Sequence, residues 1–226
     1  MTKLIRTIQV LVFAVACSSA VAMPVVDVDN VDPVFWTSGP AVIPLQQHAQ
    51  IYAVGHSGHL NRVELTLFES PQTTGVGVTF MILPTIGGLP DSNNAHALYT
   101  ATIPVAAIPV GPPTANTVSI DVSGAGIAVK PGQQFTFVVT RDDAAPTPPW
   151  VVWGFGKFGA GGTTFRRANA TSDWLVVDDG FTEGFRAIVD TPDVQVPGLG
   201  NAGLVVLVLT VMFVGLAGLK RQVWKK

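Results

Sequence analysis

The chain has 226 residues, of which 48% are hydrophobic and only 12% are charged, and its formal net charge is −2. This length allows one domain of ordinary size with accessory segments. Two of the 13 basic residues lie within residues 1–22 and four within residues 220–226, so the intervening part carries seven basic residues against all fifteen acidic ones. Such an acidic body excludes nucleic-acid binding, which needs phosphate-neutralising Lys and Arg, and it suits solubility outside the cell.

Residues 1–22 have the pattern of a secretory signal peptide. Two basic residues precede the apolar run 10–16, and small residues then lead up to Ala22. The run is shorter than the roughly 20 apolar residues that a membrane span needs, so we expect cleavage after Ala22. The alternative is a lipobox at 14–17, in which Cys17, the only cysteine of the chain, would be lipidated. Both interpretations export the domain, and neither leaves a cysteine in it for a disulfide.

Residues 23–190 are predicted to form one all-β domain, an antiparallel β-sandwich with a jelly-roll-like strand order. Apolar and other residues alternate with period two in four segments, which is typical of strands with one face on a core. The alternating apolar sets are Val63, Leu65 and Leu67; Val76, Val78, Phe80 and Ile82; Val118, Ile120 and Val122; and Phe135, Phe137 and Val139. Turn signals such as Gly87-Gly88 and Pro131-Gly132 separate them. We expect one edge strand within 24–43 and an exposed loop at 142–149.

The aromatic residues between 150 and 174 are the best candidates for a ligand surface, because flat aromatic faces stack on sugar rings. The candidate stacking residues are Trp150, Trp153 and Trp174. The competing and favoured interpretation is that one of the first two tryptophans packs in the core while the other covers a sheet edge, since their spacing in a strand places them on opposite faces.

Ionisable residues give no clear catalytic or metal-binding pattern. His48, His56, His59 and His96 are expected to be solvated loop histidines, because no cysteine or helical histidine pair completes a zinc set. Asp173, Asp178, Asp179 and Glu183 are expected to be surface acids rather than the paired carboxylates of a glycosidase. Weak calcium candidates are the oxygen-rich loop of Asp91, Asn93 and Asn94 and a second group of Asp27, Asp29 and Asp32. We therefore expect no cofactor.

The C-terminal segments predict a membrane anchor. Residues 202–219 contain no charge and a single polar side chain. An apolar run of this length is long enough to cross the hydrocarbon of a membrane. Four basic residues in 220–226 place that tail on the cytoplasmic side by the positive-inside rule. Residues 191–201 form the linker, and a buried C-terminal helix is the competing interpretation.

The linker and the apolar run together resemble a bacterial C-terminal sorting signal of the PEP-CTERM and IPTL-CTERM class, which combines a short proline motif, an apolar helix and a basic end. The matching residues are Val196, Pro197, Leu199, Gly203 and Leu204. Gly198 and Ala202 depart from the pattern of that class. The resemblance implies delivery to an exosortase-type membrane transpeptidase that cuts at the motif.

The body also resembles the β-sandwich domains that such proteins often carry. The resemblance rests on four segments: Gly58-His59-Leu60-Asn61-Arg62-Val63-Glu64-Leu65, Gly87-Gly88-Leu89-Pro90, Val129-Lys130-Pro131-Gly132-Gln133-Gln134-Phe135 and Gly184-Phe185-Arg186. It implies an architecture but no activity.

These observations predict a non-enzymatic surface or envelope protein. It would be exported, anchored in the cytoplasmic membrane with its domain outside, or transferred to the cell surface, with a structural or adhesive role in extracellular matrix. The alternatives are a carbohydrate-binding module for exopolysaccharide and an unrecognised hydrolase.

Overall fold

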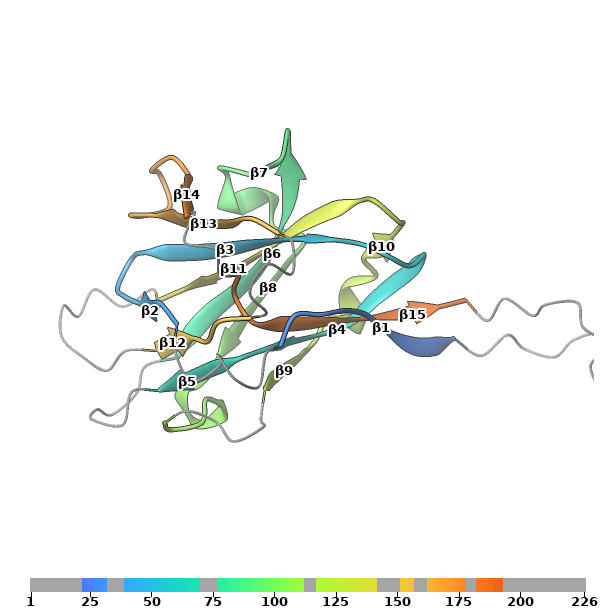
Figure 1. Cartoon of the computed structure of the whole chain (residues 1–226), viewed down its shortest axis with the longest axis horizontal. Helices are drawn as coiled ribbons and strands as arrows, with labels where there is room; N and C mark the ends of the chain where they lie inside the picture. Colours follow the sequence, from blue (N-terminus) through green and yellow to red (C-terminus); the bar gives the residue numbers. More distant parts are fainter. Residues whose placement is uncertain are drawn as a thin grey trace, which may run out of the picture. The chain divides into compact units, whose positions relative to one another are not determined.

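The computed structural model describes residues 22–31, 39–69, 77–111, 117–141, 151–156, 162–177 and 182–192. Every pairing between its strands is antiparallel (Figure 1). Three short 3-10 helices lie between strands: η1 (Asn94–His96), η2 (Val105–Ala107) and η3 (Ser123–Ala125). The predicted all-β class and antiparallel sandwich character are confirmed.

Two large sheets make the body. The first has the order β1-β15-β4-β10, with β9 also paired to β4, and the second has the order β14-β13-β3-β11-β6-β7, with β8 also paired to β6. The strands of the first sheet are β1 (Met23–Asp29), β4 (Gly58–Leu65), β9 (Val118–Asp121), β10 (Ala128–Val129) and β15 (Phe185–Thr191). Those of the second are β3 (Gln47–Ala53), β6 (Val78–Ile86), β7 (Leu89–Pro90), β8 (Tyr99–Ile103), β11 (Gln134–Thr140), β13 (Thr164–Arg167) and β14 (Leu175–Val177). A small third sheet pairs β2 (Ala41–Val42), β12 (Val151–Trp153) and β5 (Leu67–Glu69).

The main core lies between the two large sheets. The rings of Phe137 in β11 and Phe185 in β15 meet edge to face, with their centroids 5.2 Å apart, and Tyr52 in β3 stacks on Phe137 at 5.3 Å. The predicted inward residues of the alternating segments that the structure describes are buried here, including Val63, Leu65, Val78, Phe80, Ile82, Val118, Ile120, Val122, Phe135, Phe137 and Val139. Burial of these side chains is the dominant favourable term in folding such a domain.

A second apolar cluster covers the outer face of the seven-stranded sheet. It contains Ala49, Ile51, Met81, Leu83, Val138 and Phe165, with Trp174 and Ala97 packed against it. The central strands β3, β6 and β11 are therefore covered on both faces, which explains why Met81 and Val138 are apolar at positions where a half-solvated strand would carry polar residues.

Two β-bulges flank the same residue of β15. Ile188 pairs with Val26 on one side and with Arg62 on the other, and the register shifts at each place by one extra residue, Asp27 in β1 and Asn61 in β4. In β4 the bulge accommodates Asn61 as a residue unpaired in the ladder with β15. The apolar side chains before and after it therefore keep facing the core, although one additional residue in a regular strand would turn them to the opposite face. The bulge accounts for the three-residue spacing between Leu60 and Val63, which are both fully buried.

The predicted turns at Gly87-Gly88 and Pro131-Gly132 are confirmed. Gly87 and Gly88 both have positive φ, at 61° and 82°, and join β6 to β7 as a two-residue hairpin. Gly132 has φ of 80° behind Pro131, and the Gln133 N–H closes this turn on the Lys130 carbonyl at 3.0 Å. Both places need a residue that tolerates the left-handed region.

The predicted ends of the chain fall outside the described residues. This applies to the leader up to residue 21, the sorting motif and the apolar run 202–219. Among the residues that the structure does describe, no helix has the length and apolarity to cross a membrane. Met23–Thr191 form one compact unit.

Candidate functional site

A cluster of buried polar groups, here called the polar hub, lies where the three sheets meet. It consists of the segment 182–184 and the side chains that bond to it from other elements. Asn30, just after β1, donates from Nδ2 to the Thr182 hydroxyl at 2.7 Å and to the Glu183 carbonyl at 2.9 Å. Gln50 in β3 accepts the Glu183 N–H at 3.0 Å and the Thr164 hydroxyl at 2.8 Å. These bonds satisfy buried polar atoms that would otherwise destabilise the fold.

Gly184 is the point of closest packing in the polar hub. Its carbonyl accepts hydrogen bonds from the Thr66 N–H at 3.1 Å, the Thr66 hydroxyl at 3.0 Å and the Trp153 indole N–H at 3.0 Å. A Cβ atom at position 184 would lie 2.3 Å from the Thr66 Oγ1 and 3.0 Å from the Gly154 carbonyl oxygen. Only glycine therefore fits, which gives a physical reason for the first residue of the Gly184-Phe185-Arg186 segment.

His48 and Glu183 correct two of the sequence-based expectations. His48 is 0% exposed within β3, and Glu183 is 1% exposed beside the polar hub, so neither is a solvated surface residue. The Nδ1 atom of His48 lies 3.8 Å from Oε1 of Glu183, beyond hydrogen-bond distance. By contrast, His56, His59 and His96 are exposed, as is Asp173, while Asp178 and Asp179 lie outside the described residues.

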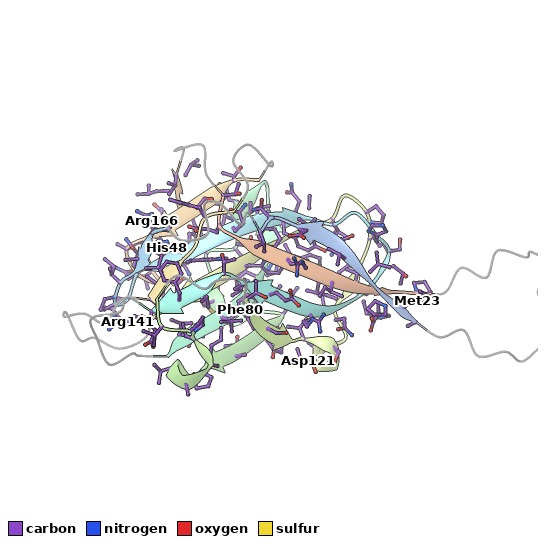
Figure 2. All side chains as sticks on the ribbon, turned by 60° about the horizontal axis from the view of Figure 1, so that its bottom comes forward. Met23, His48, Phe80, Asp121, Arg141 and Arg166 are labelled. Atoms are coloured by element: carbon purple, nitrogen blue, oxygen red, sulfur yellow. The ribbon has the colours of Figure 1, made fainter. Side chains whose placement is uncertain are left out.

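The His48 imidazole is neutral at physiological pH. Burial and, to a smaller extent, the positive charge of Arg166 lower its pKa to about 3, although a hydrogen bond with the Ala41 backbone partly opposes them. Arg166 lies directly opposite His48 in the pairing of β13 with β3. Figure 2 labels the two residues close together at the end of the sandwich opposite Met23. A neutral imidazole has the protonation state of a general base, and both His48 and Glu183 are buried away from solvent.

The weak calcium candidates Asp91, Asn93 and Asn94 lie together in one loop. Their side-chain oxygens accept hydrogen bonds from N–H groups of the protein. Asp91 accepts the Asn93 N–H at 2.8 Å and a His96 ring nitrogen lies 2.8 Å from its other oxygen. The Asn93 backbone N–H, followed by His96, lowers the pKa of the Asp91 carboxyl. The Asn94 side-chain oxygen accepts from Arg167. The described part of the chain contains no group of three or more His, Cys, Asp or Glu residues that could hold a metal ion.

Arg167 fastens this loop to the seven-stranded sheet. Its guanidinium donates to the Ser92 carbonyl at 2.8 Å and to Gln47 at 2.7 Å, and it lies 4.2 Å from the centre of the Trp174 ring. The Trp174 indole N–H in turn donates to the Asp91 carbonyl at 3.2 Å. The cation–π contact and the hydrogen bonds hold the loop over the outer apolar cluster.

Trp153 and Trp174, the candidate stacking residues that the structure describes, do not share an exposed surface. Trp153 is 0% exposed and belongs to β12 of the small sheet, so its ring offers no face to a sugar. Trp174 is partly buried against the outer cluster, with Arg167 on its ring. Trp150 lies outside the described residues.

In the second group of calcium candidates, Asp27 and Asp29 bond to different partners. Asp27, at the bulge of β1, accepts from the Tyr52 hydroxyl and from the Gly55 N–H, and a His56 ring nitrogen lies 2.7 Å from it. Burial and this carboxylate raise the pKa of Tyr52. Asp29 instead bonds to Arg186 at 3.0 Å, and Asp32 lies outside the described residues. Asp27 thus links β1 of the first sheet to β3 of the second.

A scan of the chain against protein-family models and a search of curated proteins both found no match.

Proposed function

We propose that this chain is a non-enzymatic exported envelope protein, sorted or anchored through its C-terminal segment, whose sandwich has a structural or adhesive role. The proposal includes cleavage of the leader after Ala22, a membrane span at 202–219, and recognition of the motif around Pro197 by an exosortase-type enzyme. Extracellular polysaccharide is the proposed environment of the domain. The sequence patterns at both ends of the chain are the basis for its location.

The observation that best supports this arrangement is the pairing of the two terminal strands. Met23, the expected first residue of the mature chain, is the Cα partner of Thr191, the residue at which the linker begins. Because β1 and β15 pair in an antiparallel manner, Met23 and Thr191 lie at the same end of the sandwich, and Asp29 and Arg186 lie toward the opposite end. The described domain therefore begins and ends at one end, which is compatible with attachment to a single membrane through the C-terminal segment.

A jelly-roll relationship is part of the same proposal. In chain order, the eight principal strands are β1, β3, β4, β6, β8, β9, β11 and β15. Numbered in that order, they run 1-8-3-6 in the first sheet and 2-7-4-5 in the second. This order of two interlocked four-stranded sheets supports a jelly-roll assignment, with β13 and β14 added at one edge.

The burial and hydrogen bonding of the polar residues support a non-enzymatic role. His48 and Glu183 are enclosed between the sheets, and the polar side chains of the hub bond to main-chain groups of other elements. Residues used in this way stabilise the sandwich instead of meeting a ligand.

Intact-mass measurement tests the proposal in a bacterial host that carries an exosortase-type enzyme. The wild-type protein should lack the leader and end near the motif, whereas Pro197→Ala should keep Lys226. The matched double variant Leu207→Arg with Val208→Asp should leave the membrane fraction, because each charge costs roughly 2.5–3.5 kcal/mol at the bilayer centre. Wild-type protein that keeps Lys226 would refute sorting but leave anchoring in place, and wild-type protein in the soluble fraction with Lys226 intact would refute both.

A further inference from the structure

His48 and Glu183 face each other as two hydrogen-bond acceptors. The His48 Nε2 atom lies 2.8 Å from the Gln46 side-chain oxygen, which can only accept, so the proton of the neutral ring belongs on Nε2. The backbone carbonyl of Ala41 also favours a ring N–H. Nδ1 therefore presents a lone pair to the Glu183 carboxylate 3.8 Å away, and two acceptors at this distance gain nothing from each other directly.

A hydrogen-bond donor lies on the neighbouring strand. Arg166 is opposite His48 in the ladder, and its charge acts on the imidazole. Its Nε atom and the Nδ1 atom of His48 are both buried and have no hydrogen-bond partner among the described residues. Buried polar atoms in this state are uncommon in folded proteins, and ordered water is their usual partner.

We propose that one bound water molecule joins these three residues, donating its two protons to His48 Nδ1 and Glu183 Oε1 and accepting a hydrogen bond from Arg166 Nε. Two acceptors and one donor match the hydrogen-bonding capacity of water, and buried waters typically make about three such bonds. A water about 2.8 Å from each acceptor is compatible with the separation of the two atoms. A halide would meet two acceptors, and a cation would be repelled by the Arg166 guanidinium.

The water would connect three separate parts of the sandwich. His48 belongs to β3, Arg166 to β13, and Glu183 to the segment that enters β15. The Glu183 N–H already donates to Gln50 in the polar hub, and the water would add a hydrogen bond at the Glu183 side chain. It is therefore proposed as an internal structural component and not as an exchangeable substrate.

Nuclear magnetic resonance of the full chain in detergent micelles tests the site in solution. The Hε1 proton of His48 should show a water cross-peak with the sign of a long-lived complex, and its nitrogen shifts should show an unprotonated Nδ1. Exposed His96 is the control and should show only the weak contacts of rapidly exchanging surface water. A protonated Nδ1, or no long-lived water at His48, would overturn the proposal.

A crystal structure of the full chain at about 1.5 Å resolution identifies the occupant directly. We expect one water peak within hydrogen-bond distance of the three named atoms. In Glu183→Gln, the side-chain amide can itself donate to His48 Nδ1, so the peak should be lost or shifted while the sandwich stays folded. A chloride-like anomalous signal, or direct contact between the wild-type side chains, would contradict the inference.

Discussion

Arg186 in β15 donates a hydrogen bond to Glu64 in β4, with 2.8 Å between Nη1 and Oε2. The two residues are direct partners in the ladder, and Arg186 also donates from Nη2 to Asp29 in β1 at 3.0 Å. One guanidinium therefore joins three neighbouring strands of the first sheet. Alternation in β4 correctly places Glu64 on the face opposite Leu65, but its side chain is only 12% exposed because Arg62 and Arg186 cover it.

Replacing Glu64 by Lys should destabilise the domain by about 1–2 kcal/mol. The change removes two ion pairs that are partly shielded from solvent and places a third positive charge beside Arg62 and Arg186. Urea unfolding followed by tryptophan fluorescence measures the loss. Asp173→Lys, the same charge change at an exposed site, should alter stability by less than about 0.5 kcal/mol. Equal effects of the two variants would show that the Arg186 network contributes nothing.

Leu65 lies on the opposite face of β4, which packs on the main core. It is 0% exposed within the main core, so Leu65→Ala should cost about 2–5 kcal/mol, and Leu65→Asp should give no folded protein. Leu175→Ala is the matched control, because that side chain is 67% exposed at the edge strand β14. Thermal unfolding of the alanine variants compares them, and similar melting temperatures would contradict the assigned inward face.

Gly184→Ala tests the packing of the polar hub. The new methyl group would come within 2.3 Å of the Thr66 hydroxyl and would press on main-chain atoms that cannot move independently. Overpacking of this kind should cost about 1–3 kcal/mol. Gly124→Ala in η3 introduces the same methyl group where no atom lies within 4 Å, so its stability should stay close to wild type. Denaturation midpoints decide the matter, and a silent Gly184→Ala would mean that the hub tolerates more volume than its geometry indicates.

The strands and turns that could be predicted from the sequence are those in which local chemistry and burial agree. Val118 and Ile120 alternate with exposed residues because β9 has one face on the core. Strand β3 was not predicted because its inward residues include His48 and Gln50. These polar residues hide the apolar alternation that marks a strand with one face on the core. The two bulges also lack a strong local signal, although the spacing of Leu60 and Val63 marks the one in β4.

The polar hub could not be predicted because its members are distant in sequence. Asn30 and Thr182 are 152 positions apart, and Gln50 and Glu183 are 133 apart. Nothing within either segment indicates the other, and a lone histidine or glutamate is more often exposed than buried. The spacing of Trp150 and Trp153 did raise the core interpretation, which holds for Trp153. The leader and the sorting motif remain predictions.

The buried imidazole of His48 should make the stability of the domain depend on pH. Its pKa is about 3 in the folded state against 6.5 for a free imidazole, so between these values the unfolded chain binds a proton that the folded chain does not. The contribution of His48 is therefore fully present above pH 6.5 and is lost progressively as the pH falls toward 3. Over pH 6.5 to 4.5, the loss of stability should be about 2–3 kcal/mol, at up to 1.4 kcal/mol per pH unit.

Unfolding free energies of wild type and His48→Gln across this pH range measure the loss, with exposed His96→Gln as the control. The His48→Gln curve should be flatter than the wild-type curve even if that variant is less stable overall, and the His96→Gln curve should keep most of the wild-type slope. Parallel curves for wild type and His48→Gln would show that folding leaves the pKa of His48 near 6.5, and would contradict the lowering by burial and Arg166.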